Sequence, residues 1–309
     1  MLARDALRKL AYSTLSAAPI TEAFFRLGDS RLRVLGFHGI SSERGFRRQM
    51  EWLADHCNAV SASQVVHALA GTSLPPRPVW VTFDDGDPSV VEVGLPILRD
   101  LHIHATMFVC PGLVDTDLPF WWQTVEKAIE LGVVFRSHVI TDAAVGEAKR
   151  LPDEERRQMV NELNVLIASA TGTVLTRPQV TTGSLQRWVD AGHSLGNHTW
   201  DHPILSRCTV DQQARQIVHA HEWLIETFKG DAALFAYPNG ESSTHSEEVL
   251  RSLNYDAAVL FDHRLSGLAD PYHVSRLRVN ADGEVAGFRA RVSGTHAAVY
   301  HARLRLLGR

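Results

Sequence analysis

Seven short apolar runs alternate with helical patterns along this chain of 309 residues, and this alternation constrains the fold more than any other feature. Between the runs lie amphipathic segments such as 46–56, 211–228 and 246–254. Such alternation is typical of a largely parallel sheet covered by helices, so we expect an α/β fold. The predicted strands are 32–37, 79–83, 105–109, 193–197, 233–237, 257–261 and 273–279.

The alternation breaks between about residues 113 and 180. The segments 118–132 and 151–172 both read as helices, the second opened by Pro152, Asp153 and Glu154. We expect a helical insertion that decorates the sheet or caps its edge. Within it, Trp121 and Trp122 are either core residues or a platform on which a sugar stacks.

The predicted strand at 79–83 runs directly into Asp84, Asp85 and Gly86. Adjacent carboxylates repel and raise each other's pKa, which a protein tolerates when a cation lies between them or when the charge has a task. These aspartates follow the carboxyl end of a strand, where α/β enzymes build their sites. Taken alone, Asp-Asp-Gly is also compatible with a plain turn.

His198 and His202 supply the complement, four residues apart after the predicted strand 193–197. On a helical turn, residues i and i+4 share one face, so both imidazoles would reach one metal ion. Two histidines and one aspartate form a three-ligand site with an open position, as in catalytic zinc sites. The second aspartate would then accept a proton from water.

These motifs resemble those of the polysaccharide deacetylases, carbohydrate esterase family 4, with its NodB-type domain. The stretch 82–86 (TFDDG) matches the first family motif, 198–202 (HTWDH) matches the second, and 235–240 (FAYPNG) resembles the third. The resemblance covers about residues 33 to 285 and implies a distorted (β/α)7 barrel. We therefore divide the chain into an amphipathic helical leader (1–31), a barrel with the insertion (32–285) and a C-terminal extension (286–309).

The resemblance also implies a role for each matching residue. Asp84 would be the general base, with Asp85, His198 and His202 as ligands of one divalent metal. Zinc is the family's metal, although cobalt, nickel, manganese and iron also suit such a site. The backbone N–H of Tyr237 would help to stabilise the oxyanion. The reaction would be hydrolysis of an N-acetyl group on an amino sugar.

Two departures from the chitin-deacetylase pattern point to the exopolysaccharide-biosynthesis branch of the family. Phe235 and Ala236 stand where an arginine would orient the base, and no clear Leu-x-His motif supplies a general acid. The stretches 36–40 with 46–53, and 274–279, resemble features of that branch. We predict that Arg276 orients Asp84 and that His38 is the general acid, with His273 as its rival.

Charge and composition limit the partners. The formal net charge of −4 gives no electrostatic argument for binding nucleic acid. The N-terminal 27 residues lack the apolar core of a secretory signal but read as a basic amphipathic helix or two. This predicts a cytoplasmic protein, with the leader either packed on the domain or in peripheral contact with the inner face of the membrane.

The sequence thus predicts a metal-dependent N-deacetylase that acts on an amino sugar of a cell-envelope or exopolysaccharide precursor. One alternative keeps the site but changes the substrate, giving a deformylase or deacylase of a nucleotide sugar or secondary metabolite. A cyclic-amide hydrolase on the same scaffold is a second alternative. A non-catalytic carbohydrate-binding protein is a third, although such a protein would be expected to lose Asp84 or a metal ligand.

Overall fold

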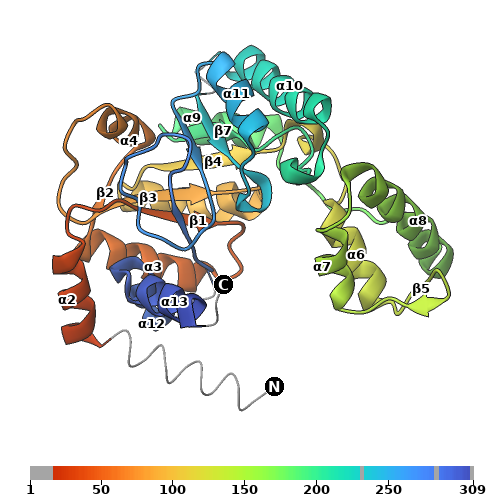
Figure 1. Ribbon diagram of the computed structural model, residues 1–309, viewed down its shortest axis with the longest axis horizontal. Coiled ribbons are helices and arrows are strands. Elements are labelled where there is room, and N and C mark those ends of the chain that lie inside the picture. The colour runs from red at the N-terminus through yellow and green to blue at the C-terminus, as the bar shows by residue number, and fades with distance from the viewer. Residues whose placement is uncertain (1–16, 230–232, 282–284, 307–309) are drawn as a thin grey trace.

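A parallel sheet rolled into a barrel forms the body of the molecule in the computed structural model (Figure 1). The structure describes residues 17–229, 233–281 and 285–306. The strand order is β10-β1-β3-β4-β7-β8-β9, and the short β2 pairs with β3. A parallel bridge between Val259 and Val274 brings the two ends of the sheet together, so the predicted (β/α)7 barrel is confirmed. The strands are β1 (Arg33–Phe37), β2 (Asn58–Ala59), β3 (Pro78–Phe83), β4 (Ala105–Val109), β7 (Ser194–Asn197), β8 (Leu234–Ala236), β9 (Ala257–Val259) and β10 (Arg276–Arg278).

Successive strand residues point to opposite faces of a sheet, and here they separate two apolar cores. Val34, Trp80 and Phe108 belong to the cluster enclosed by the strands. Their chain neighbours Leu35 and Val81 belong to the cluster between the strands and the outer helices. Two residues beyond Trp80 comes Thr82 and then Asp84, so the alternation that fills the barrel also directs Asp84 towards its interior.

Helices cover the barrel, and several begin with side-chain caps that the sequence supplies. Ser61 with Gln64, and Thr209 with Gln212, form capping boxes in which each side chain bonds to the other residue's backbone. Ser42 caps the helix predicted at 46–56, which therefore begins three residues earlier. The helices around the barrel are α3 (Glu43–His56), α4 (Ala62–Leu69), α5 (Leu95–Asp100), α9 (Thr182–Asp190), α10 (Val210–Phe228) and α11 (Thr244–Ser252).

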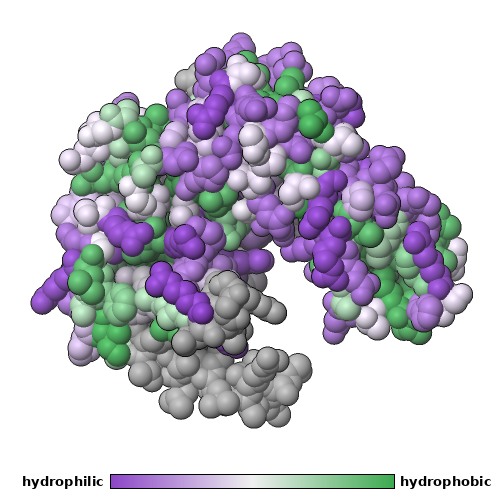
Figure 2. Space-filling view, viewed as in Figure 1, coloured by the Kyte–Doolittle hydropathy of each residue, from purple (hydrophilic) through white to green (hydrophobic). Residues whose placement is uncertain are grey.

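The predicted insertion lies between β4 and β7 and projects from the barrel body (Figures 1 and 2). It has its own apolar cluster, in which α6 packs against α8 around residues such as Val125 and Leu163. A small hairpin that the sequence pattern did not predict also belongs to it. The elements are α6 (Trp121–Glu130), β5 (Val134–Phe135), β6 (His138–Val139), α7 (Ala143–Ala148) and α8 (Asp153–Thr171).

Both terminal regions contribute helices to one side of the barrel. Helix α2 (Ala18–Leu27) packs beside α12 (Val285–Ser293) and α13 (Thr295–Leu306). Phe25 is buried against Trp52 of α3 at 6.2 Å between ring centroids, and Phe288 meets the same indole edge-on. The described part of the leader is therefore packed on the domain, while residues 1–16 lie outside the described residues. No helix within the described ranges has the length and hydropathy needed to cross a membrane.

His193 directly precedes β7, and its side chain bonds to the first residue of β4. It therefore lies at the amino-terminal end of the strands, whereas the two aspartates follow the carboxyl end of β3. Its ring is buried, stacks on Trp188 at 4.3 Å and accepts a hydrogen bond at Nδ1 from the Ala105 N–H at 3.1 Å. Burial lowers the pKa of His193 to about 4 from its ordinary 6.5. Only the neutral ring can accept the Ala105 bond, so folding favours deprotonation.

This depressed pKa predicts a pH dependence of stability. The unfolded chain binds a proton at His193 near pH 6.5 and the folded chain only near pH 4, so stability is full above 6.5 and falls between these values. Between pH 7.5 and 5 the loss attributable to His193 is about 2 kcal/mol. Urea unfolding at both pH values, for the wild type and His193→Asn, measures it. The variant keeps an acceptor for Ala105 but has no ionisable ring, so an equal loss in both proteins would contradict the prediction.

Candidate metal centre and active site

The turn that follows β3 separates the two adjacent carboxylates. Asp84 continues the strand, because its N–H donates to the Phe37 carbonyl at 2.9 Å. Asp85 and Gly86 then take the left-handed backbone conformation, with φ of +69° and +72°. A glycine adopts this conformation without the steric cost that other residues pay. The turn thereby leaves Asp84 inside the barrel and places Asp85 at its mouth.

Asp84 is held by a bidentate ion pair with Arg276. The two guanidinium nitrogens Nη1 and Nη2 lie 2.6 and 2.8 Å from Oδ1 and Oδ2, and both side chains are almost fully buried, at 0% and 1% exposure. Burial alone would raise the pKa of Asp84, but Arg276 and His198 lower it below the ordinary value. The carboxylate therefore stays ionised, and the two guanidinium nitrogens fix its orientation.

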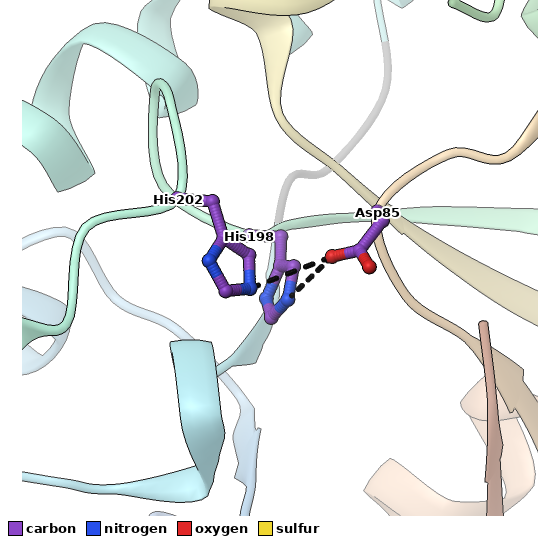
Figure 3. A group of neighbouring side chains, drawn as sticks. All are labelled: Asp85, His198 and His202. Carbon is purple, nitrogen blue, oxygen red and sulfur yellow. Dashed lines mark ion pairs between the residues drawn. The ribbon is translucent and has the colours of Figure 1, made fainter. Parts of the chain in front are cut away.

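Three potential metal ligands converge beside this pair (Figure 3). Asp85 Oδ1 lies 3.5 Å from His198 Nε2 and 3.4 Å from His202 Nε2. His198 Nδ1 lies 2.7 Å from the Ala236 carbonyl oxygen, to which it donates, so the ring is oriented with Nε2 towards Asp85. Burial lowers the pKa of His202 to about 3, so its imidazole stays neutral, the form that binds metals.

The donor set fits a divalent metal ion. Asp85 Oδ1 is buried and makes no hydrogen bond to any described residue. Burying a carboxylate oxygen without a hydrogen bond destabilises the folded state. A cation bound by this oxygen and the two imidazoles would satisfy it, and two histidines with one carboxylate are a known catalytic ligand set. Asp84, already paired with Arg276, stays free of that set.

The histidines do not share a helix face, which corrects the expectation from their spacing. Residues 198–202 form a loop after β7, and Thr199 and His202 take left-handed φ values of +68° and +62°. This loop, not a helical turn, folds the two rings to 4.7 Å between centroids. The spacing predicted that the two imidazoles lie together, but it predicted this from a helical turn that the structure does not contain.

His38 and His273 differ in where the structure places them. His38 follows β1 and lines a pocket of about 310 Å³ together with Asp84, Asp85 and both histidines. Its ring stacks on Phe261 at 5.7 Å between centroids, and burial lowers its pKa. The side chain of His273 is 37% exposed, pairs with Asp270 and Glu247, and does not line that pocket.

Tyr237, whose backbone N–H was expected to stabilise the oxyanion, is not among the residues that line the pocket. Its backbone N–H donates to the Val259 carbonyl at 3.2 Å, between β8 and β9, and its side chain is buried in the core. Asn239, two residues later, lines the pocket instead and takes a left-handed φ of +59°. The sequence signal for this was the Pro-Asn-Gly turn that directly follows the strand.

Aromatic residues at the start of the insertion surround His202. Trp122 meets the His202 ring edge-on at 4.6 Å, Phe120 does so at 5.9 Å, and Trp121 Nε1 donates to the His202 carbonyl at 3.3 Å. Both tryptophans also line the pocket. The two tryptophans therefore pack against a candidate ligand, as core residues would, and also line the pocket, as a platform for a sugar would.

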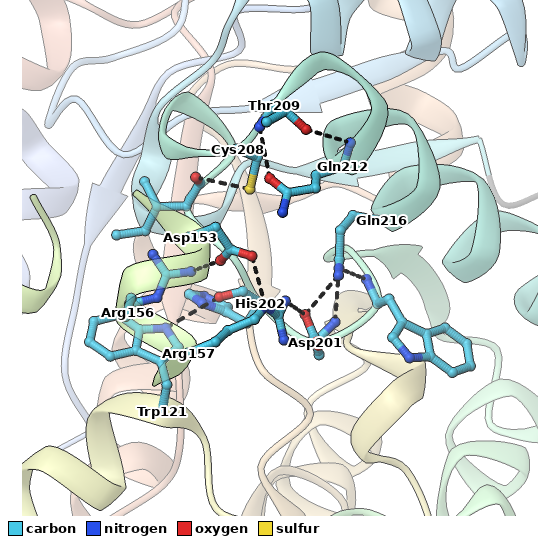
Figure 4. A network of polar contacts seen from close by, with 12 residues as sticks. Trp121, Asp153, Arg156, Arg157, Asp201, His202, Cys208, Thr209, Gln212 and Gln216 are labelled. Carbon is cyan, nitrogen blue, oxygen red and sulfur yellow. Dashed lines mark hydrogen bonds and ion pairs between the residues drawn. The ribbon is translucent and has the colours of Figure 1, made fainter. Parts of the chain in front are cut away.

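A polar network ties the insertion to the histidine loop (Figure 4). Arg157 of α8 forms a bidentate pair with Asp201 at 2.8 and 2.8 Å, and its Nε donates to the buried Asp153. Gln216 donates to Asp201 and accepts from the Asp201 N–H. Since Asp201 directly precedes His202, this network holds a candidate ligand through its chain neighbour.

Comparisons with known proteins agree with this geometry. The family model described as polysaccharide deacetylase matches residues 71–180 and 157–258, more than half of the chain. The chain belongs to the polysaccharide deacetylase family. It is 32% identical over 77 residues to the poly-beta-1,6-N-acetyl-D-glucosamine N-deacetylase of Staphylococcus aureus (strain MSSA476). That alignment covers 25% of this chain and 27% of the relative, so the chain matches about a quarter of that relative's length.

Solved structures share the fold at low sequence identity. IcaB from Ammonifex degensii superposes with a TM-score of 0.60 at 20% identity, covering 86% of this chain and 98% of IcaB. A de-N-acetylase from Aggregatibacter actinomycetemcomitans gives 0.61 at 14% identity, covering 84% and 99%. These similarities confirm the barrel architecture. The chemistry has to be inferred from the residues of this chain.

The Arg157 network predicts that metal affinity depends on a residue that does not touch the metal. Arg157→Met leaves Asp201 and Asp153 without their shared cation, so the His202 loop loses its support, and we expect affinity to fall at least about tenfold. Competition between the protein and a chelating indicator, with zinc and with cobalt, measures the dissociation constants. Arg150→Met, at an exposed position of the same insertion, is the matched control. Equal affinity in both variants would contradict the network's role, and no metal bound by the wild type would contradict the site.

Proposed function

We propose that the protein is a metal-dependent hydrolase that removes the N-acetyl group from an amino sugar of a cell-envelope or exopolysaccharide precursor. One observation carries the proposal: an ionised, arginine-oriented carboxylate lies beside an Asp-His-His ligand set in a single pocket. Family membership and the amino-sugar N-deacetylase among the relatives support the same chemistry. A carbohydrate-binding protein without catalysis would not need Asp84 to be ionised and held in this way.

The carboxylates, the two candidate ligand histidines and Arg276 each have a task in amide hydrolysis. Asp85, His198 and His202 would hold the metal, for which zinc is our proposal among the metals that such a set accepts. A bound metal would polarise the amide carbonyl and lower the pKa of water. Asp84 accepts the proton of the attacking water, and Arg276 keeps its carboxylate aimed while this occurs. A C–O bond forms, the C–N bond breaks, and acetate and a free amine leave.

The leaving nitrogen needs a proton, and we propose that His38 supplies it. His38 lines the pocket from β1, so its ring can reach a bound substrate. Burial lowers its pKa, while Asp85 and Asp84 beside it favour the protonated form. For the oxyanion, the backbone of Asn239 replaces that of Tyr237 in this proposal, because only Asn239 lines the pocket.

Acetate release tests the proposed function. The metal-loaded protein is incubated with N-acetylglucosamine oligosaccharide, nucleotide-linked N-acetylglucosamine and lipid-linked N-acetylglucosamine. Asp84→Asn keeps the shape of the side chain but removes the base, so kcat should fall by at least about 10²-fold. N-formyl and longer N-acyl analogues run in parallel. Turnover of these alone would move the assignment to a deformylase or deacylase, and turnover that survives in Asp84→Asn would exclude the base.

Variants of His38 and His273 should differ in their effect on kcat. His38→Ala should lower kcat about 10²-fold, because the amine would leave without a proton, and should flatten the alkaline side of the pH–rate profile, where a general acid loses its proton. His273→Ala should change kcat by less than about twofold, since its ring pairs with Asp270 and Glu247 outside the pocket. Steady-state kinetics of both variants from pH 5 to 9 compare them. The opposite order of effects would assign the acid to His273.

A further inference from the structure

Two cationic side chains line the pocket, Arg278 from the barrel and Lys149 from the insertion. Arg278 lies two residues beyond Arg276 on β10, and residues at this spacing share one face of a strand. Arg276 is buried on Asp84, whereas Arg278 is exposed at the carboxyl end of the strand. Arg278 lines both the 310 Å³ pocket and the adjoining one of about 420 Å³.

Lys149 belongs to the insertion and lines the same pocket as Arg278. It follows the last residue of α7, and its Nζ donates to Asn239 Oδ1 at 2.8 Å, across the space between insertion and barrel. Partial burial, and then the charge of Arg278, lower the pKa of Lys149. Two like charges thus lie close enough to repel, an arrangement that is stabilised when an anion binds between them.

Neither cation is neutralised by a carboxylate. Within the described ranges, no ion pair of 4.0 Å or less involves Lys149 or Arg278. Asp84 is already paired with Arg276, and Asp85 faces the imidazoles. Glu126 is the remaining carboxylate that lines the pocket. If a divalent cation were bound by Asp85, its charge together with those of Lys149 and Arg278 would exceed the charge of the three carboxylates that line the pocket.

Glu241 is the acidic group whose charge raises the pKa of Lys149, against the effects of burial and of Arg278. Its two oxygens already accept from Ser206 Oγ at 2.6 Å and from Asn239 Nδ2 at 2.6 Å. Both oxygens of Glu241 are therefore engaged by groups other than Lys149.

We propose that the pocket binds an N-acetylated amino sugar that carries a phosphate group, and that Lys149 and Arg278 bind the phosphate oxygens. This inference rests on the proposed function, whose substrate class it narrows. A phosphate presents oxygens in several directions, which suits a lysine point charge on one wall and an arginine fork on the other. The shared chemistry is a sugar phosphate ester, supplied either by a nucleotide-linked or by a lipid-linked sugar.

The experiment compares four N-acetylglucosamine substrates on the metal-loaded full chain: the methyl glycoside, the 1-phosphate, a nucleoside diphosphate conjugate and a short polyprenyl diphosphate conjugate. Acetate release gives kcat and KM for each. We expect kcat/KM for the 1-phosphate to exceed that for the neutral glycoside at least about tenfold, mainly through KM. The two conjugates then distinguish the nucleotide source from the lipid source.

Variants assign the preference to the two cations. Lys149→Gln and Arg278→Gln should each reduce the ratio of kcat/KM for the phosphate substrate to kcat/KM for the neutral glycoside about tenfold. Lys127→Gln is the matched control, because Lys127 also lies on the insertion but pairs with Glu130 and does not line the pocket. Isothermal titration of N-acetylglucosamine 1-phosphate into each protein measures binding without turnover.

The outcomes separate this inference from the proposed function. Deacetylation of all sugars with equal kcat/KM would overturn the inference and leave the proposed function intact. Binding of the 1-phosphate that depends on Lys149 and Arg278, without release of acetate from any substrate, would uphold the inference about the ligand and overturn the deacetylase. A preference for phosphate that both glutamine variants retain would overturn the assignment to these residues.

Discussion

The buried pair of Asp84 and Arg276 is the interaction on which the rest of the site depends. Taking two charges out of water is costly, and the cost is recovered only where the geometry is good and the remaining donors are satisfied. Arg276 meets this condition, since Nε donates to the Leu260 carbonyl at 2.9 Å and Nη1 also lies 3.2 Å from Thr82 Oγ1. Removing one partner would leave an uncompensated charge and cost about 3–5 kcal/mol. The pair thus unites barrel stability with the orientation of the base.

Phe261 extends this arrangement to the pocket wall. Its ring lies 4.0 Å from the Arg276 guanidinium carbon and stacks on His38, so one aromatic side chain positions both groups. Gly36 is the residue that gives this ring its room, because a Cβ there would come within 2.4 Å of it. The base, the residue that orients it and the candidate acid therefore form one packed unit, beside the loop that carries the histidines.

Much of the barrel was predictable because strand periodicity is local. The predicted strand 105–109 matches β4 at both ends, and the strands expected at 233–237 and 273–279 occur in shorter form. Asp85, His198 and His202 were recognisable because their spacing forms a motif. Lys149 and Phe261 were not, since each reaches the pocket only through tertiary packing of segments distant in sequence. The hairpin at 134–139 was missed for a related reason: two-residue strands have no period to detect.

The seam where the barrel closes carries a consequence for motion. Strand β10 pairs with β1 over three residues, but the sheet is joined to β9 on its other side through the bridge at Val274. Beside this bridge, the Leu260 N–H donates to the Val274 carbonyl and the His263 N–H donates to the Arg276 carbonyl, so these bonds must break before the seam opens. Arg276 lies on the strand at the seam and Asp84 lies two strands away. If the seam opens, Asp84 would lose Arg276 as its partner and would no longer be oriented to activate water. The hydrogen-exchange protection of the amides of β10 would then measure how often the site is fully assembled.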